Sequence, residues 1–403
     1  MVRLGSGNRF AQNNWILEMK SIVAIRKCQD YEPSRLRPAL EKAISESCDY
    51  KSLIKPGDTV LMKPNLLRSS NPEQAIVTHP MFVEMAGEIL RDCGARLSIT
   101  DSPPLGNLQR VLVKSGYGDL LRRLDIKPVP LLQKKMIEFG DNRIYKRLEL
   151  ASEAFDFDRM INLAKLKTHC QMTLSLAVKN LFGLVIGTDK ASWHLRAGKV
   201  QDNFAHVLLQ IYETVRPDIS IIDGVLGMEG NGPNSGKPRK VGIIGASTDA
   251  IALDSVIGRL VGFPPDSVRT CVLGNDLGLG NADAHDMEVV GDDLSGFPLT
   301  DFEPPKSMSL AWNLSYWNPV RRFMENHIIT KPRIDSDLCI KCGVCMRHCP
   351  PQAISDSSGK MVINRKACIS CFCCHELCAS DAISIKQPFM GRLLSRIDRK
   401  SVV

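Results

Sequence analysis

The sequence predicts an α/β domain, built on a mostly parallel sheet covered by helices on both faces, followed by a small α+β domain rich in cysteine. Three observations lead to this fold class. From Ser21 to about residue 295, short β-branched runs alternate with amphipathic segments. The strand candidates are continuous apolar runs, as expected for a sheet buried on both faces. Nine of the 14 cysteines follow residue 338.

Six segments have the length and composition of buried strands. They are Ser21–Arg26, Thr59–Lys63, Arg96–Thr100, Met160–Lys165, Ile219–Asp223 and Val241–Gly245. Five further segments have the apolar spacing of amphipathic helices. They are Pro38–Glu46, Met81–Arg91, Leu174–Leu181, Asn203–Val215 and Ala250–Gly262. In the last of these, we expect Asp249 to cap the helix and Asp254 to face solvent.

The cysteines near the carboxyl end repeat one spacing. The pattern C-x2-C-x2-C-x3-C occurs twice, 29 residues apart, on Cys339, Cys342, Cys345 and Cys349 and on Cys368, Cys371, Cys374 and Cys378. Two-cluster ferredoxins use this run: three close cysteines hold one [4Fe-4S] cluster and the fourth ligates the other. The sequence therefore predicts one cluster on Cys339, Cys342, Cys345 and Cys378, and a second on Cys368, Cys371, Cys374 and Cys349. Cys373 aligns with Val344 and has no assigned role.

Zinc and disulfides are the alternatives to iron-sulfur clusters. Paired C-x2-C elements also bind zinc, but a tetrahedral site needs four ligands, whereas here eight occur with the x3 step of ferredoxins. Disulfides are disfavoured because the sequence has no secretory segment. Between the two motifs, we expect a strand at Ala353–Ser355 to pair with one at Met361–Ile363 through a turn at Ser358 and Gly359. This is the α+β pattern of a bacterial-type ferredoxin domain.

Charge and hydropathy limit the classes of function. The net charge is +8, but no long basic run occurs, and 12 basic against 6 acidic residues fall within 331–403, where they offset negative clusters. We therefore expect no nucleic-acid surface. No run of 18 apolar residues occurs, so no transmembrane segment is expected. The sequence indicates a cytoplasmic protein from a low-oxygen setting.

Polar residues gather just past several predicted strands, where ligands of parallel sheets bind. Lys63 and Asn65 follow one strand, and Asp101 and Ser102 follow the next. Further along come Lys165, Lys167 and His169, then Lys179 and Asn180, then Asp223, Glu229, Gly230 and Gly232. The lysines predict a site for an anionic small molecule bearing phosphate or carboxylate. The loop EGNGPNSGKP fits neither nucleotide fingerprint, although its amides could line an anion.

Two groups in this set have acid-base chemistry. His169 is a candidate acid, base or polar orienter, and Glu229 could accept a proton from substrate or orient a lysine. Solvated lysines and a structural histidine are the plain alternatives. Trp193 and His194 could form a lid over a planar ligand, whereas ordinary core packing is the alternative.

Several longer motifs carry a resemblance. KPNLL, INLAKLKTH, LAVKNLFG and IDGVLGMEGNGP, followed by the two cysteine motifs, resemble the DUF362 family of iron-sulfur proteins over roughly residues 20–385. The resemblance implies an α/β domain joined to a ferredoxin domain more firmly than it implies a reaction. It also suggests a flavin-like cofactor.

The predicted organisation has five parts. These are a leader at 1–19, the α/β domain at 20–300, a linker at 301–332, the ferredoxin domain at 333–386 and a basic tail at 387–403. Trp312, Tyr316 and Phe323 have near-helical spacing, which predicts a docking helix in the linker. A natural start at Met19 would make the leader an extension.

Two functions follow from these parts. The first is an oxidoreductase that passes electrons between two [4Fe-4S] clusters and an anionic organic cofactor or substrate, such as FMN or a deazaflavin. An external low-potential donor or acceptor protein would exchange electrons with the clusters. The alternative is a ferredoxin-like electron carrier or docking subunit that serves a partner enzyme without substrate chemistry of its own.

Overall fold

The computed structural model describes residues 20–104, 107–187, 189–198, 200–306 and 331–386. The predicted leader, the docking helix with Trp312, Tyr316 and Phe323, and the basic tail lie outside the described residues. No helix among the described residues is long and apolar enough to cross a membrane.

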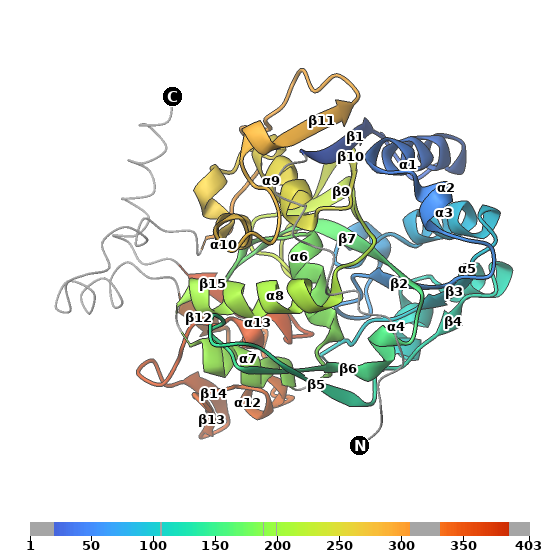
Figure 1. The fold of residues 1–403 in the computed structure, drawn as a ribbon. Coiled ribbons are helices and arrows are strands. Elements are labelled where there is room, and N and C mark those ends of the chain that lie inside the picture. Colours follow the sequence, from blue (N-terminus) through green and yellow to red (C-terminus); the bar gives the residue numbers. More distant parts are fainter. Residues whose placement is uncertain (1–19, 105–106, 188, 199, 307–330, 387–403) are drawn as a thin grey trace.

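A nine-stranded sheet forms the centre of the α/β domain (Figure 1). Its strands are β1 (Ser21–Lys27), β2 (Thr59–Pro64), β3 (Arg96–Ile99), β4 (Lys127–Pro128), β7 (Arg159–His169), β8 (Thr173–Ser175), β9 (Ile219–Glu229), β10 (Lys237–Ser247) and β11 (Met287–Gly291). The order is β11-β1-β10-β9-β7-β2-β3-β4, with β8 paired to β7. The pairs β9–β7–β2–β3–β4 and β1–β11 are parallel, whereas β10 is antiparallel to both its neighbours and β8 is antiparallel to β7. The predicted mostly parallel sheet is confirmed.

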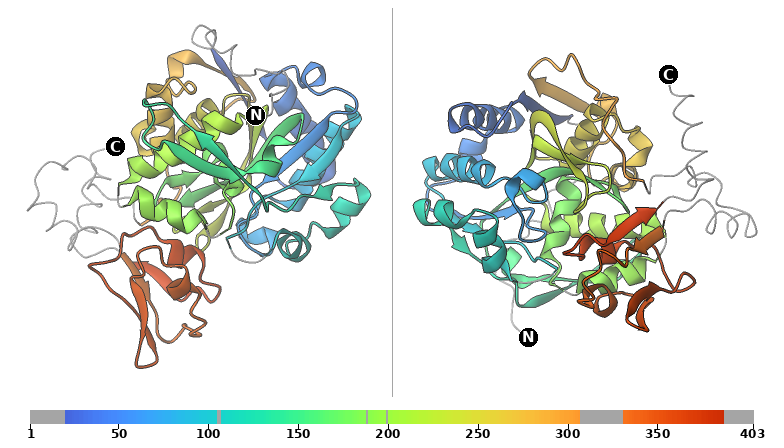
Figure 2. Two further views of the ribbon diagram at one scale, coloured as in Figure 1. Left: turned by 60° about the horizontal axis from the view of Figure 1, so that its bottom comes forward. Right: turned by 180° about the vertical axis from the view of Figure 1, so that it is seen from behind.

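Helices cover both faces of the sheet, as Figures 1 and 2 show. On β2, Leu61 enters one apolar core while Val60 and Met62 enter the other, because successive side chains of a strand point to opposite faces. The first core contains α6 (Ala177–Asn180), α8 (Gln201–Val215) and α9 (Ala250–Leu260). The second contains α1 (Pro33–Ser47) and α3 (Pro80–Asp92).

Shorter elements complete the domain. The remaining helices are α2 (Tyr50–Leu53), α4 (Leu108–Lys114), α5 (Gly118–Arg123), α7 (Asp189–Ala197) and α10 (Arg269–Asp276). Single 3₁₀ turns are η3 (Pro72–Gln74), η4 (Ser152–Phe155), η5 (Leu181–Leu184), η6 (Pro265–Ser267) and η7 (Ala284–Asp286). A separate antiparallel pair consists of β5 (Lys134–Glu138) and β6 (Arg147–Ala151).

All six predicted strands are present, and four of the five predicted helices lie within or across observed helices. The helix predicted at Leu174–Leu181 is wrong at its start, because Thr173–Ser175 instead pairs with the end of β7. The helix begins only where both carboxylate oxygens of Asp254 accept the backbone N–H groups of Ala177 and Val178, at 2.7 and 3.0 Å. Asp254 is therefore buried, and its predicted exposure was wrong. Asp249 caps α9 as predicted.

The ferredoxin domain is small and has two similar halves. Its elements are β12 (Lys331–Ile334), α12 (Val344–Arg347), β13 (Ile354–Ser357), β14 (Lys360–Ile363), α13 (Cys373–Glu376) and β15 (Ile383–Lys386). β12 pairs with β15, and β13 pairs with β14 through the predicted turn, in which Asp356 accepts the Gly359 N–H at 2.9 Å. The predicted hairpin is confirmed.

The ferredoxin domain packs against one end of the larger domain (Figure 2). Ser235 Oγ donates to Asp381 at 3.0 Å, and His375 Nε2 lies 3.2 Å from the Asn231 carbonyl oxygen. Beside them, Cys170 forms an apolar cluster with Phe372 and Ile385 of the ferredoxin domain. The glycine-rich loop after β9 thus contacts the ferredoxin domain.

Candidate functional site

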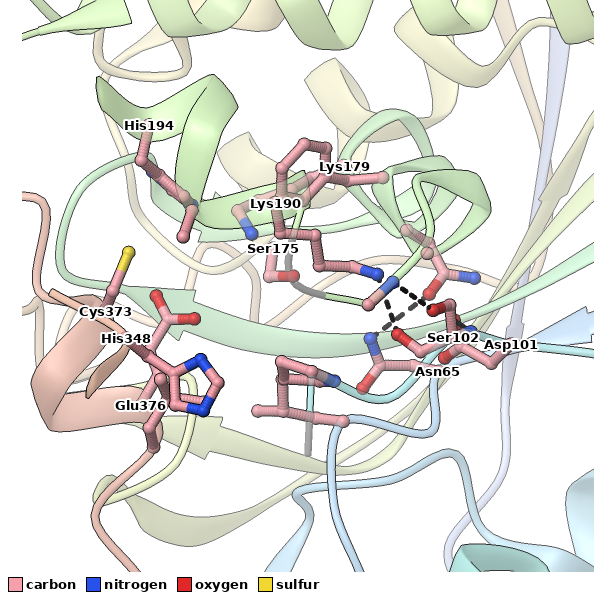
Figure 3. Close-up of a pocket in the computed structure, with 18 residues that line it drawn as sticks. Asn65, Asp101, Ser102, Ser175, Lys179, Lys190, His194, His348, Cys373 and Glu376 are labelled. Carbon is pink, nitrogen blue, oxygen red and sulfur yellow. Dashed lines mark hydrogen bonds between the residues drawn. The ribbon is translucent and has the colours of Figure 1, made fainter. Parts of the chain in front are cut away.

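A pocket opens where the two domains meet (Figure 3). It encloses about 760 Å³ of empty space, part of it open to solvent. The α/β domain contributes residues that follow β2 and β3 together with parts of the segment 175–194, and the ferredoxin domain contributes His348, Cys373, Glu376 and Leu377. A concave space with a few converging polar groups is typical of small-molecule sites.

Two lysines bring positive charge to the pocket. Lys179 of α6 makes no hydrogen bond or ion pair within the part of the chain that the structure describes, and its Nζ lies 6.0 Å from the ring centre of Phe182. Lys190 of α7 donates to the carbonyl oxygens of Ser102, at 2.7 Å, and Val185. Burial lowers the pKa of both lysines, that of Lys190 to about 7. An anion bound beside them would favour their protonated forms.

His194 carries an unpaired polar atom in the same wall. The side chain is only 4% exposed and its ring stacks on Phe204 at 4.2 Å between centroids. Burial lowers its pKa to about 3, so the ring is neutral at pH 7. Its Nδ1 has no hydrogen-bond partner among the described residues. An unpaired buried polar atom is costly, so Nδ1 is an unsatisfied group in a residue that lines the pocket.

Glu376 is the acidic group on the ferredoxin side of the pocket, and His169 lies behind it. Glu376 Oε1 is 3.1 Å from His169 Nε2. His169 Nδ1 accepts the backbone N–H groups of Gln171 and Met172 at 3.1 and 3.2 Å, so the neutral ring carries its proton on Nε2. Burial lowers the pKa of His169 to about 4. Burial would raise the pKa of Glu376, yet His169 and Lys179 lower it to about 2. A neutral imidazole thus faces an ionised carboxylate.

Two predicted asparagines reach the pocket from a buried network. Lys167 Nζ donates to Asn65 Oδ1 at 2.6 Å and to the Ile76 carbonyl oxygen at 2.8 Å. Asn65 Nδ2 donates to Asn180 Oδ1 at 3.2 Å. Burial lowers the pKa of Lys167 to about 7. Asn65 and Asn180 line the pocket, whereas Lys167 supports them from below.

Lys63 is held beneath the same wall by Asp101. The Lys63 ammonium lies 3.0 Å from Asp101 Oδ1, and both side chains are buried. A Cβ atom at Gly183 would collide with Asp101 and Lys63, so the glycine of LAVKNLFG is needed for this close approach. Asp101 and Gly183 line the pocket, and Lys63 acts on it through Asp101.

Lys165 and Asp223 do not line the pocket. They form a buried ion pair at 2.8 Å, and the Tyr31 hydroxyl donates to Asp223 at 2.8 Å and accepts from Lys165 at 2.9 Å. His79 stacks on Tyr31 with 3.6 Å between ring centres. This group is fully hydrogen-bonded and packs as part of the domain interior.

Glu229, Gly230 and Gly232 also lie outside the pocket. Glu229 Oε2 accepts the Glu303 backbone N–H at 3.1 Å, and the Gly230 N–H donates to the Glu303 carbonyl oxygen at 2.7 Å. Gly232 packs against Thr168 so closely that a Cβ would collide with the Thr168 carbonyl. The loop has structural contacts, and its predicted anion-binding role gains no support from this geometry.

The cysteines of the two predicted sets all lie in the ferredoxin domain. Cys349, Cys368, Cys371 and Cys374 all line a second, smaller cavity there. Cys339, Cys345 and Cys378, three members of the other set, pack against the apolar cluster of the domain. Thus each set draws three cysteines from one motif and one from the other. Eight free thiols in two such groups have the donor chemistry of two [4Fe-4S] clusters.

Cys373, the fifth cysteine of its motif, faces a different space. It lines the interface pocket, while its neighbours Cys371 and Cys374 line the smaller cavity. Likewise His348 lines the pocket and Cys349 lines the cavity. The wall between the pocket and one cluster position is therefore a single layer of residues.

Sequence reasoning did not select Lys190, Glu376 or His348 for this site. Glu376 and His348 belong to the ferredoxin motifs, and nothing local in the sequence shows that these loops face Lys179 (Figure 3). Lys190 sits in a helix whose amphipathic pattern gives no separate signal.

The fold and the cysteine sets define a ferredoxin-type iron-sulfur protein with an α/β domain, and comparison with known proteins agrees. The family described as "Domain of unknown function (DUF362)" matches residues 60–259, and a 4Fe-4S dicluster domain matches residues 331–379. The chain belongs to the DUF362 family. Its role in iron-sulfur electron transfer follows from the dicluster domain.

Individual relatives match the chain to different extents. It is 37% identical over 262 residues to the "Thylakoid-associated protein sll1697" of Synechocystis sp.. The aligned region covers 65% of this chain and 81% of that protein. It is 42% identical over 45 residues to Ferredoxin-1 of Rhodobacter capsulatus, covering 11% of this chain and 69% of the ferredoxin. Among solved structures, the lactate racemase apoprotein from Thermoanaerobacterium thermosaccharolyticum aligns with a TM-score of 0.38 and 12% identity, over 58% of this chain and 55% of that chain.

Proposed function

We propose that the protein is an iron-sulfur oxidoreductase that passes electrons between its two [4Fe-4S] clusters and an anionic organic molecule in the interface pocket. One observation carries this proposal. The pocket is lined by Lys179 and Lys190 from one domain and by chain neighbours of predicted cluster ligands from the other. A molecule bound there would contact the residues that enclose a cluster, so electrons would have a short path to it.

The ligand proposed for the pocket is a flavin or deazaflavin mononucleotide. Its phosphate would bind beside the lysines, where a negative charge offsets their burial. A bound flavin would supply the conversion between one-electron delivery by clusters and two-electron chemistry on a substrate.

The chain's own residues would bind and orient this ligand. Lys179 and Lys190 would hold the anionic group, and His194 Nδ1 would gain its missing hydrogen bond. Asn65 and Asn180 would present fixed amide groups, because each is already held by neighbours. His169 would position Glu376 at the ferredoxin side of the pocket. Catalytic roles for His169 and Glu229 remain predictions.

The proposed cluster ligands are the two crossed sets of cysteines. One cluster would be held by Cys339, Cys342, Cys345 and Cys378, and the other by Cys349, Cys368, Cys371 and Cys374. The second set encloses the cavity beside the pocket. We therefore refer to the two as the distal and the proximal cluster, respectively.

Binding of FMN tests the proposal. Protein with both clusters, prepared without air, is titrated with FMN and with a deazaflavin mononucleotide while their fluorescence is followed. The variant Lys179→Met/Lys190→Met should bind at least about tenfold more weakly, since each lost charge contact contributes on the order of 1 kcal/mol. Lys127→Met, at an exposed lysine on β4, is the matched control and should bind normally.

The opposite result would favour a simple electron carrier. Neither ligand would then bind, or both would bind the double variant as tightly as the native chain. In either case the pocket would have no part in recognising an anion of this class, and the proposed chemistry would be rejected.

A further inference from the structure

One edge of the ferredoxin domain brings a cluster position to the surface. Of the eight proposed ligands, Cys342 alone is exposed. In the same loop, Leu338 and Ile340 are 55% and 68% exposed. Adjacent apolar side chains that stay exposed on a small domain are a common feature of surfaces that contact another protein.

Basic side chains surround this edge. Lys341 precedes Cys342, and the Arg347 guanidinium donates to the Cys342 carbonyl oxygen at 3.0 Å. The Lys341 ammonium also lies 3.8 Å from the position that a Cβ at Gly359 would occupy, which places it beside the β13–β14 turn and its exposed Lys360. The cationic side chains thus form a group around the loop 338–342.

The acidic residues of the domain are fewer than the basic ones. Residues 331–386 contain eight Lys and Arg and five Asp and Glu. Two of the five acids face the α/β domain, because Glu376 lies by His169 and Asp381 accepts from Ser235. The other three lie near the loop 338–342: Asp337 directly precedes Leu338, and Asp335 and Asp356 each accept a backbone N–H of their own turn, at 3.0 and 2.9 Å. Because the clusters are themselves negative, an acidic partner would be attracted only by the basic side chains of Lys341, Arg347 and Lys360.

The proximal cluster position is less accessible, because none of its four proposed ligands is exposed. Cys371 and Cys374 are 7% and 8% exposed, and the residues beside them line the interface pocket. A protein partner at the surface would therefore meet the distal cluster first.

From these observations we propose that a small acidic redox protein docks on the edge formed by Leu338, Ile340, Lys341, Cys342 and Lys360. Electrons pass between the partner and the distal cluster, and then between the distal and the proximal cluster. This inference rests on the proposed electron-transfer function and adds its protein partner and its point of entry.

The test uses a reduced, acidic [2Fe-2S] ferredoxin as the partner. Under anaerobic conditions, stopped-flow absorbance records electron transfer to the full chain carrying both clusters, at several salt concentrations. The rate constant should fall as salt rises, because exposed charges are screened within about 10 Å at 0.1 M. The variant Ile340→Asp/Lys341→Glu should react at least about tenfold more slowly at low salt, a usual size for reversing steering charges.

A matched variant elsewhere controls for general effects of new acidic residues. Leu132→Asp/Lys127→Glu replaces an exposed apolar residue and an exposed lysine of the α/β domain, and should react at the native rate. Iron content and the EPR signals of the reduced clusters show whether each variant is fully loaded. Should the loop variant lose a cluster, Lys360→Glu, which lies outside the ligand loops, takes its place and should slow the reaction in the same direction.

Chemical reduction separates the two proposals. If neither dithionite nor the stronger reductant Ti(III) citrate can reduce the clusters of the native chain, the electron-transfer function itself fails. If either reductant reduces them while the fully loaded edge variant accepts electrons from the ferredoxin at the native rate, or the control variant slows equally, the docking edge is wrong and the function stands.

Discussion

At the scale of single residues, Lys190 makes ligand binding depend on pH. Burial lowers its pKa from 10.5 to about 7, so the free protein holds a cation there below pH 7 and a neutral amine above it. Affinity for FMN should therefore fall from pH 7 to 9, by up to about tenfold per unit, as one proton must be taken up on binding. Fluorescence titration across this range measures the slope.

The substitution Lys190→Met removes the ionisable amine, and the variant is measured by the same FMN titration. Its binding should be weaker at pH 7 and should change less with pH. A slope equal to that of the native chain would assign the pH dependence to another group. Lys179 is the nearest alternative, because burial also lowers its pKa.

Cys373 and Cys374 are adjacent in sequence, but we expect only Cys374 to be required for cluster binding. Cys373 lines the pocket, whereas Cys374 lines the cavity with the proposed proximal ligands. Cys373→Ala should therefore keep both clusters, while Cys374→Ala should lose the proximal one. Iron and sulfide analysis with EPR spin counting measures the difference. Equal losses in both variants would contradict the proposed ligand set.

The proposal that each cluster takes one ligand from the other motif can be tested at Cys349. Although it belongs to the first motif, it shares the cavity of Cys368, Cys371 and Cys374. Cys349→Ala should affect the same EPR signal as Cys374→Ala. Loss of the other signal instead would show that each motif binds its own cluster.

Residues near strand ends were predictable from sequence, and their partners were not. Asn65, which follows β2, lines the pocket as expected, because parallel strands end at one edge of the sheet. The contact of His169 with Glu376 joins residues of separate domains, and no periodicity or spacing encodes such a contact.

At the scale of elements, the loop after β9 determines how the ferredoxin domain docks. Gly232→Ala would force its methyl group against the Thr168 carbonyl, next to the contacts of Asn231 and Ser235 with the ferredoxin domain. We expect a loss of stability of about 1–3 kcal/mol, as for other overpacked sites. Thermal unfolding measures the loss, and limited proteolysis should reveal weaker docking.

Gly118→Ala is a suitable control for that substitution. Gly118 begins α5, and no atom lies within 4 Å of the position that its Cβ would take. Its unfolding temperature should be unchanged or slightly higher, because alanine favours helix. If Gly232→Ala behaves like this control, the loop is more adaptable than its packing indicates.

Element types followed from local pattern, except where a distant side chain intervened. Six of the nine strands of the central sheet were predicted because their apolar runs are continuous, whereas β4, β8 and β11 were not. The segment Leu174–Leu181 has the same apolar character, but pairing with β7 and the carboxylate of Asp254 divide it into a strand and a short helix. The end of β7 lies only a few residues before this segment, whereas Asp254 is 77 residues from Ala177 in the sequence.

At the scale of the whole molecule, the two domains should respond differently to loss of iron. The ferredoxin domain has a small apolar core of Ile354, Met361, Cys374 and Ile383, whereas two large cores fill the α/β domain. After oxidation and chelation of iron, residues 331–386 should lose protection from hydrogen exchange, because ligation holds such small domains together.

Mass spectrometry of exchanged peptides measures this response. The peptide that contains β13 and β14 should exchange quickly without iron, and peptides from β7 and β9 should keep their protection. Retained protection in β13 and β14 would mean that the polypeptide alone stabilises the ferredoxin domain. Collapse of protection in both domains would mean that they unfold as one unit.

The overall organisation could be read from the sequence because each domain has its own repeating pattern. The interface pocket could not, because its walls combine segments more than 150 residues apart, such as those around Lys190 and His348. Packing between domains depends on shape and on single contacts, for which sequence periodicity carries no information.

The exposure of Cys342 has a consequence for handling the protein. Oxidants in aerated buffer reach a solvent-exposed [4Fe-4S] cluster before a shielded one. They commonly remove one iron from the exposed cluster. Damage should therefore begin at the distal cluster as a [3Fe-4S] species, while the cube beside the pocket survives longer. A partly aerated sample should then still exchange electrons with the proposed small molecule after electron exchange with the proposed protein partner has stopped.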